Sequence, residues 1–520
     1  MSTVKILWAD DEIELLKPHI LFLEQKGYEV ETCLSGDEVL DKLEDFRADI
    51  IFLDENMPGL TGLETLELIK KQHSSVPVVM ITKSEEESIM DEAIGGKISD
   101  YLIKPVNPKQ ILMAIKKNVH VDQIQSEKAT TKYQQAFREI GMRINDRLNI
   151  EEWQELYEQM VFWELELQKA QDTGMDEILA MQKAEANLQF SRFIEDNYID
   201  WVNGAEDAPN MSHNVLKNKV FPLVDKNKSS LFLIVIDNLR FDQWKVLKPL
   251  ISEHFWVEKE ETYVSILPTT TQYARNALFA GLMPLEIEQR FPDKWSNDDE
   301  EGNKNNYEKV YFSEQLKRFG LENKFQYYKV LNADFGKKVL DDVPRMMQNP
   351  INIIIYNFVD MLSHARTDTE IVKQLARDEA AYRSVTVSWY EHSTLQKIIK
   401  KIAKQGGRVI ITTDHGSVRV KNPVKVVGDK SVNTNLRYKQ GKTLNYNPKE
   451  VFEITHPKEA HLPQINVSQK FIFAKSDDFF VYPNNYNHYV NYYKDTFQHG
   501  GVSLEEMLVP IVALTPKNKQ

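Results

Sequence analysis

Two short, strongly apolar runs that each lead to an aspartate constrain this chain more than any other feature. LFLIVI precedes Asp237, and RVIITT precedes Asp414. Apolar runs of about four to eight residues are typical of strands that are buried on both faces of a parallel sheet. Because open α/β sheets build their ligand sites at the carboxyl ends of the strands, we expect both carboxylates at one such edge.

Three further segments of the last 300 residues carry oxygen and imidazole groups that bind metal ions. The additional candidates are Thr271 in ILPTTTQYAR, Asp360 and His364 in DMLSH, His415 next to Asp414, and His499 in QHGGVSLEE. This ligand set, which has no thiolate, suits zinc or a similar divalent ion. One aspartate at a strand end is usually structural and one histidine is usually no ligand. The joint occurrence of these residues nevertheless predicts a two-metal site that cleaves phosphoesters.

Composition bounds the class of protein. The chain has 520 residues, 42% hydrophobic and 27% charged, so we expect a soluble protein of about three domains. The net charge of −14 argues against a protein that coats DNA. No run approaches the ~18 apolar residues of a membrane span. We see no secretion signal, and a single cysteine, Cys33, excludes an internal disulfide, so we expect a cytoplasmic protein.

The first 120 residues alternate between strand-like and helix-like segments. The strand-like runs are VKILWAD, DIIFLDE, VPVVMIT and ISDYLIK. This alternation predicts a doubly wound parallel sheet. Its strand ends carry Asp10, Asp11 and Asp54, three acids that suit Mg²⁺. Thr82 and Lys104 are suited to bind phosphoryl oxygens close to one of these acids.

These residues closely resemble the receiver domain of two-component response regulators. The resemblance implies that a sensor histidine kinase supplies a phosphoryl group to Asp54. The implied roles are Mg²⁺ binding by Asp10, Asp11, Asp54 and the backbone carbonyl of Asn56, a switch hydroxyl at Thr82, a switch aromatic at Tyr101 and a phosphate contact from Lys104. It also implies a cis Lys104–Pro105 bond. Lys83 stands where a small residue is common in the family.

The middle of the chain has a helical pattern. In EEWQELYEQMVFWELELQKA, large apolar residues recur every three or four positions, at Trp153, Leu156, Tyr157, Met160, Trp163 and Leu167. We interpret this stripe as core or as an interface with a neighbouring part, not as a cofactor site. No basic recognition helix is visible, so we expect no sequence-specific DNA binding. The predicted domains are a receiver (1–120), a helical bundle (121–205) and an α/β domain (206–520).

The last of these domains resembles the PglZ domain of the alkaline phosphatase superfamily, on the five segments quoted above. The resemblance implies one zinc bound by Asp237, Thr271, Asp414 and His415, and a second bound by Asp360, His364 and His499. It also implies that Thr271 is the nucleophile, with Thr270 as the neighbouring candidate.

Basic residues favour a substrate with more than one phosphate. The stretch from Arg419 to Lys449 holds eight basic residues and follows the predicted ligands Asp414 and His415. It is interpreted either as substrate binding, for a short or cyclic oligonucleotide, or as a solvated lysine-rich loop. The candidate substrate contacts are Arg275, Arg437, Lys439 and Lys442. The acidic segment 285–310 is expected to be a surface loop.

Receiver, bundle and PglZ domain in this order resemble the PorX-type regulators of Bacteroidetes. This resemblance implies control of type IX secretion, with a sigma factor as a candidate partner. Because receivers commonly pair through the face that phosphorylation rearranges, we also expect a homodimer that forms on phosphorylation. Two hypotheses follow. The first is a zinc phosphodiesterase controlled by phosphorylation of Asp54. The second is a signalling scaffold with a structural metal site that binds a sigma factor or another protein.

Overall fold

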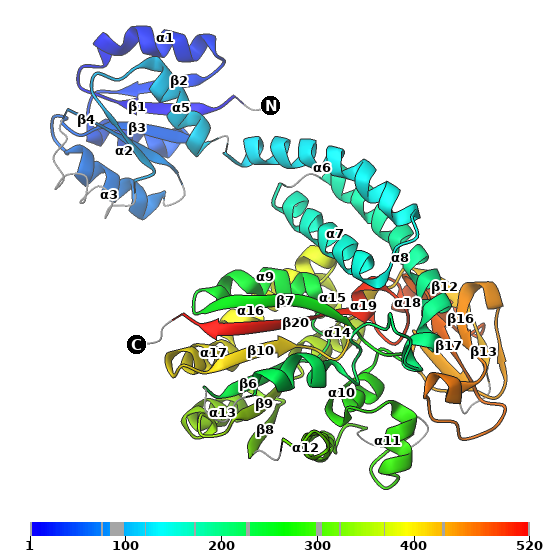
Figure 1. Cartoon of the computed structure of the whole chain (residues 1–520). Coiled ribbons are helices and arrows are strands. Elements are labelled where there is room, and N and C mark those ends of the chain that lie inside the picture. Colours follow the sequence, from blue (N-terminus) through cyan, green and yellow to red (C-terminus); the bar gives the residue numbers. More distant parts are fainter. Residues whose placement is uncertain are drawn as a thin grey trace. The chain divides into compact units, whose positions relative to one another are not determined.

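The computed structural model describes residues 3–73, 76–83, 98–119, 121–170, 173–224, 229–297, 304–321, 324–368, 370–428 and 432–517. These residues form two compact units, one comprising mainly residues 1–132 and the other mainly residues 133–520 (Figure 1). No helix in the described ranges is long and apolar enough to cross a membrane.

The first unit is a five-stranded parallel sheet in the order β2-β1-β3-β4-β5. This order confirms the predicted doubly wound receiver fold. Residues 84–97, part of the segment between Thr82 and Lys104, lie outside the described residues. The elements are β1 (Lys5–Ala9), α1 (Lys17–Gln25), β2 (Glu29–Cys33), α2 (Gly36–Asp45), β3 (Ile50–Asp54), α3 (Gly62–Gln72), β4 (Val78–Thr82), β5 (Asp100–Ile103) and α5 (Pro108–Asn118).

Three long helices form the middle of the chain: α6 (Val121–Asn145), α7 (Ile150–Ala170) and α8 (Thr173–Val202). The apolar stripe of α7 is buried apart from the half-buried Trp163. Its Tyr157 ring lies 6.0 Å from the Phe241 ring of the α/β domain. The stripe is therefore core between the helices and the α/β domain, as the sequence predicts.

The α/β domain is built on a six-stranded sheet in the order β7-β20-β10-β6-β9-β8 (Figure 1). The strands are β6 (Leu231–Ile236), β7 (Phe255–Val264), β8 (Phe325–Val330), β9 (Ile351–Tyr356), β10 (Arg408–Thr412) and β20 (Leu508–Pro516). The four strands from β10 to β8 run parallel, whereas β20 runs antiparallel to both of its neighbours. Every residue of β6 and β9 is buried, because both faces of the sheet are covered.

Helices and small sheets surround this core. The helices and the turn η4 are α9 (Phe241–Ser252), η4 (Thr271–Arg275), α10 (Asn276–Ala280), α11 (Pro284–Arg290), α12 (Glu308–Arg318), α13 (Ala333–Met346), α14 (Phe358–Asp368), α15 (Glu370–Leu375), α16 (Glu379–His392), α17 (Thr394–Lys404), α18 (Tyr486–Tyr493) and α19 (Leu504–Met507). The excursion between β10 and β20 forms β11 (Val418–Arg419), β12 (Asn422–Lys425), β13 (Val427–Gly428), β14 (Tyr438–Gly441), β15 (Leu444–Asn445), β16 (Val451–Ile454), β17 (Lys470–Ala474), β18 (Asp478–Val481) and β19 (Phe497–Gln498).

Candidate functional site

The carboxyl ends of β6 and β10 bring the two predicted aspartates together. The strands are adjacent, parallel and in register, with Val235 opposite Thr412. Asp237 follows β6 directly, and Asp414 lies two residues beyond β10. Both carboxylates are buried. The sheet edge expected from the sequence therefore forms, and it holds two acids side by side.

The first cluster consists of Asp237, Asp414 and His415, whose possible ligand atoms all lie within 4.8 Å of one another. Thr271, at the start of η4, points its hydroxyl into this cluster. Its Oγ1 atom lies 3.1 Å from His415 Nε2 and 3.3 Å from Asp237 Oδ1. Thr270 differs, because its buried hydroxyl has no hydrogen-bond partner among the described residues.

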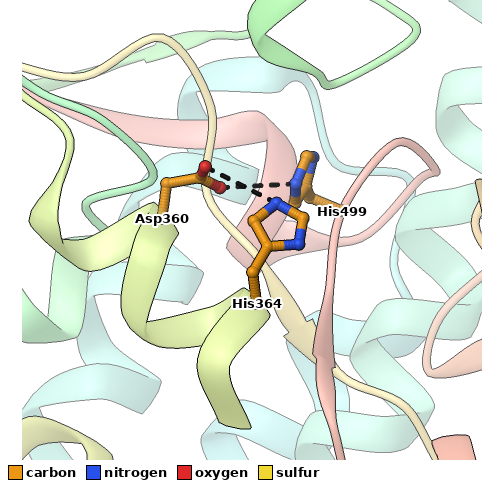
Figure 2. Close-up of side chains that lie close together, drawn as sticks. All are labelled: Asp360, His364 and His499. Carbon is orange, nitrogen blue, oxygen red and sulfur yellow. Dashed lines mark ion pairs between the residues drawn. The ribbon is translucent and has the colours of Figure 1, made fainter. Parts of the chain in front are cut away.

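The second cluster consists of Asp360, His364 and His499 (Figure 2). Asp360 and His364 lie one turn apart on α14, and both histidine Nε2 atoms lie 3.5 Å from an Asp360 oxygen. The pairing of β11 with β19 carries the chain back to the sheet edge and positions His499 just after β19. The rings of His499 and His415 stack 4.3 Å apart, so the two clusters adjoin.

Backbone carbonyls orient two of the three histidines. His415 Nδ1 lies 3.1 Å from Gly416 O, and His499 Nδ1 lies 3.2 Å from Thr269 O. A carbonyl can only accept, so Nδ1 carries the proton and the Nε2 lone pair is free to bind a metal. Burial lowers the pKa of both imidazoles, that of His499 strongly, which keeps them neutral as metal ligands must be.

The carboxylates of the site lack enough partners for the charge they bury. Burial raises the pKa of Asp237 to about 6, and it also raises the pKa values of Asp360 and Asp414. Asp360 Oδ1 and Asp414 Oδ2 are buried without a hydrogen-bond partner among the described residues. Buried, unsatisfied acceptors of this kind fit bound cations, since an unpaired buried charge is costly.

Arg275 supports the first cluster through its contact with Asp237. Its Nη1 atom lies 2.7 Å from Asp237 Oδ2, and its Nε atom donates to Glu308 Oε1 at 2.7 Å. The guanidinium is fully buried. Two of its three nitrogens, Nη1 and Nε, are thus engaged by carboxylates inside the protein, and the interpretation of Arg275 as a substrate contact remains a prediction.

The segment read as an acidic surface loop supplies two supporting residues that sequence reasoning missed. Glu308 is buried against Arg275, and Asn305 Nδ2 donates to the backbone carbonyl of Thr271 at 2.8 Å. Residues 298–303 of this segment lie outside the described residues. No local pattern marks Asn305 or Glu308, because their partners lie more than 30 residues away in sequence.

The basic stretch is also corrected in part. Arg437 is fully buried and forms an ion pair with Glu506, with 2.6 Å between Nη2 and Oε2. Lys439 is buried and donates to the backbone carbonyl of Asn433 at 2.7 Å. Neither side chain is available to a ligand in solution, so their interpretation as substrate contacts is wrong. Lys442 is exposed, and residues 429–431 lie outside the described residues.

The receiver unit has its own acidic cluster, made of Asp10, Asp11 and Asp54. Lys104 Nζ lies 2.8 Å from Asp10 Oδ2 and 2.9 Å from Asp54 Oδ2. Burial raises the pKa of Asp54, against the opposing effect of Lys104. The Lys104–Pro105 bond is cis, as predicted.

The remaining positions that the sequence singled out in the receiver are Thr82, Lys83, Tyr101 and Asn56. Thr82 donates its hydroxyl to Glu55, and Lys83 forms an exposed ion pair with Glu12. Tyr101 is 40% exposed. The backbone of Asn56 follows Asp54 by two residues on an exposed turn.

Comparisons with known families divide the chain in the same order. A response regulator receiver domain matches residues 6–116, a PorX response regulator linker domain matches residues 123–202, and the BREX system PglZ alkaline phosphatase-like domain matches residues 215–514. The last match covers more than half of the chain. It contains Thr271 and both clusters that could hold a metal ion.

Curated relatives match the receiver part. The alkaline phosphatase synthesis transcriptional regulatory protein PhoP of Bacillus subtilis is 34% identical over 114 residues, which is 22% of this chain and 47% of that protein. The transcriptional regulatory protein CpxR homolog of Haemophilus influenzae is 40% identical over 114 residues, which is 22% of this chain and 48% of that protein. The chain thus spans about half the length of these curated relatives.

A solved structure of the chemotaxis response regulator CheY4 of Vibrio cholerae is 31% identical and covers 22% of this chain and 98% of its own, with a TM-score of 0.22.

The matches to the three family models assign the chain to a family. The chain belongs to the PglZ family of alkaline phosphatase-like domains and has the PorX-type order of receiver, linker and PglZ domain.

Proposed function

We propose that this chain is a response regulator whose output is a zinc-dependent phosphodiesterase that cleaves short or cyclic oligonucleotides. One observation carries the proposal. The Thr271 hydroxyl lies within 3.3 Å of both Asp237 and His415, beside a second cluster of three ligands. A hydroxyl held at the edge of two adjoining metal-binding clusters is the arrangement that phosphoryl transfer to a side chain requires.

The residues fit two divalent ions. Asp237, Thr271, Asp414 and His415 would hold one, and Asp360, His364 and His499 the other. Oxygen and neutral imidazole donors without sulfur suit zinc. Two divalent ions held by these residues would supply positive charge to the phosphodiester and would lower the pKa of a bound hydroxyl.

The chain's own residues then perform two displacements. In the first, Thr271 Oγ1 loses its proton and bonds to phosphorus, while the bond from phosphorus to one sugar oxygen breaks and that oxygen gains a proton. In the second, water attacks the phosphodiester on Thr271, releases the nucleotide phosphate and returns the hydroxyl. Arg275 and Glu308 hold Asp237 in position during both steps.

Control is proposed to come from the receiver. A receiver domain implies a sensor histidine kinase as partner and Asp54 as the phosphorylated residue. The acidic cluster with Lys104 suits Mg²⁺ and a phosphoryl group at that position. The proposed biological role is control of type IX secretion, in keeping with the PorX-type order of domains. The alternative remains a signalling scaffold whose metal site is structural and which acts by binding a sigma factor or another protein.

The test uses the full chain with zinc and a linear dinucleotide. Thr271→Val should abolish turnover while most of the bound zinc, measured by elemental analysis, remains on the other six ligands. Thr270→Val is the matched control and should retain turnover, since its hydroxyl has no hydrogen-bond partner among the described residues. Wild-type protein that binds zinc but cleaves no phosphodiester would support the scaffold and contradict the enzyme.

A further inference from the structure

A cavity of about 750 Å³ lies beside the candidate active site and has no role in the reaction described above. It is bordered by the carboxyl ends of β8 and β9, by parts of α13, α14, α16 and α17 and by the end of α15, all labelled in Figure 1. Its volume falls in the range of about 300–1,000 Å³ that is common for small-ligand pockets.

The cavity shares its walls with the metal-ligand elements. The backbone carbonyl of Tyr356, at the end of β9, accepts a hydrogen bond of 2.8 Å from the backbone N–H of Asp237. Phe358 and Met361 line the cavity from α14, the helix that carries Asp360 and His364. At helical spacing these two pairs occupy adjoining faces of α14. A ligand that fills the cavity therefore lies one helix width from the second ligand cluster.

The lining is apolar and aromatic. The rings of Phe358 and Trp389 stack face to face at 4.6 Å with 1° between their planes, and both remain partly exposed. Three large aliphatic side chains at the cavity are unusually open: Leu331 is 56% exposed, Met361 52% and Leu375 61%. Such a surface gains free energy when a planar, apolar group covers it.

The charge of the lining selects an anion. Lys337, Lys397 and His392 line the cavity, and none of its described lining residues is an aspartate or glutamate. Lys337 also forms an exposed ion pair with Asp334, with 2.9 Å between Nζ and Oδ1, which a phosphate would compete for. This is notable in a chain of net charge −14. Aromatic surface flanked by lysines is the combination that binds single-stranded nucleic acid, because bases stack on the rings and phosphates meet the cations.

We propose that this cavity is a nucleobase subsite, which binds the base of a nucleotide adjacent to the phosphodiester that Thr271 attacks. The inference rests on the proposed function and adds a specificity element to it. A substrate with a base at this position gains affinity from stacking and from Lys337 and Lys397, whereas a diester without one does not. The subsite makes oligonucleotides better substrates than small diesters.

The first experiment compares two substrates on three proteins. The substrates are a linear dinucleotide and methyl 4-nitrophenyl phosphate, with zinc present. Leu331→Glu/Leu375→Glu adds negative charge to the exposed rim of the cavity. The matched control, Ile465→Glu/Val467→Glu, changes two exposed aliphatic residues elsewhere in the same domain. We expect the ratio of kcat/KM for the dinucleotide to that for the small diester to fall about tenfold in the cavity variant only.

The second experiment measures binding without turnover. A dinucleotide that contains 2-aminopurine is added to the Thr271→Val protein, and stacking is followed by fluorescence quenching. Quenching should be saturable, and Trp389→Ala or Leu331→Glu/Leu375→Glu should weaken the apparent affinity about tenfold. Because this readout needs no catalysis, it separates the subsite from the enzymatic proposal.

The outcomes are distinct. In one outcome, the wild-type protein cleaves the dinucleotide, and the cavity variant keeps the wild-type ratio of kcat/KM values and the wild-type quenching. The subsite proposal is then wrong, whereas the phosphodiesterase proposal stands, and the cavity would instead bind a protein partner. If the wild-type protein cleaves neither diester, the enzymatic proposal fails. Quenching that depends on Trp389 then still supports the subsite, and its absence overturns it.

Discussion

Arg275 and Asp237 form a fully buried ion pair, with 2.7 Å between Nη1 and Oδ2. The same guanidinium bonds Glu308 and lies 3.8 Å from Asp414 Oδ2. One planar cation thus fixes a proposed zinc ligand and balances part of the negative charge that the strand ends bury. Only arginine offers two donor edges in a rigid plane, so this geometry depends on the guanidinium itself.

We therefore predict that Arg275→Lys damages the site although it keeps the charge. One ammonium cannot bond Asp237 and Glu308 in the same geometry, and a buried pair that loses a partner costs about 3–5 kcal/mol. Dinucleotide kcat/KM should fall at least tenfold, and the Tm should fall by several degrees. Arg377 forms an exposed ion pair with Asp378, so Arg377→Lys is the control and should change neither kcat/KM nor Tm. A kcat/KM of Arg275→Lys equal to that of the wild-type protein would contradict the proposal that Arg275 holds Asp237 in position.

The free energy of unfolding should depend on pH through the titration of Lys439. Burial lowers the pKa of this lysine from 10.5 to about 7. The folded protein therefore releases the proton at lower pH than the unfolded chain. Wild-type stability should accordingly rise from pH 7 to pH 10, by up to about 1.4 kcal/mol per pH unit.

Lys439→Met removes this titration, so the variant should exceed the wild type in stability at pH 7, and its advantage should shrink as the pH approaches 10. Urea unfolding at pH 7, 8.5 and 10 measures the difference. Lys442→Met, at an exposed position, should show no such trend. An advantage that is the same at all three pH values would show that Lys439 is not the titrating group.

Arg383 joins the helical region to the α/β domain. On α16 it donates to Asp242 at 2.9 Å and to Gln168 of α7 at 2.6 Å, and it also pairs with Glu164 of α7. Arg383→Gln would leave the buried Asp242 and the half-buried Glu164 short of a cation, so we predict a fall in Tm of several degrees. Hydrogen exchange should rise in α7 before it rises in β6. Arg192→Gln, on the exposed face of α8, is the control. Exchange that rises equally in both elements would argue against a local link.

Phosphorylation should rearrange the receiver and change the oligomeric state. A phosphoryl group on Asp54 competes for Lys104 and offers the Thr82 hydroxyl a better acceptor than Glu55. We expect Tyr101, now 40% exposed, to turn inward. The altered surface includes β5 and α5, and we predict that the beryllofluoride mimic converts monomer to dimer and raises the dinucleotide rate.

Sedimentation with and without beryllofluoride and Mg²⁺ measures this change, with Asp54→Ala as control. An unchanged mass and an unchanged rate in the wild-type protein would contradict the coupling.

The sheet edge could be predicted from the sequence because local pattern determines it. An apolar run followed by an aspartate marks the carboxyl end of a buried strand, and Asp237 and Asp414 needed only adjacency of β6 and β10 to meet. Likewise, the three- and four-residue spacing on α7 was enough to predict which face would be buried. The roles of the individual ligands remain predictions.

The supporting residues could not be predicted in this way. Arg437 meets Glu506 across 69 positions of sequence, and Arg275 meets Glu308 across 33. In the sequence, Arg437 and Lys439 belong to a basic stretch, which by itself predicts exposed side chains. Arg437 precedes β14 and Lys439 lies in it, and Tyr438, Lys439 and Gln440 are all buried because this strand packs in a three-stranded sheet. Which charges are buried depends on tertiary partners that sequence spacing does not reveal.

The antiparallel strand β20 has a consequence for synthesis of the protein. It lies between β7 and β10, although it follows every other strand of the sheet in the chain. The sheet is therefore divided until residues 508–516 have been made, and His499 reaches the other ligands only shortly before them. A ribosome-bound chain holds a finished receiver long before it holds a closed catalytic sheet. Under the proposed function, the nascent protein can thus receive its signal before it has any means of acting on it.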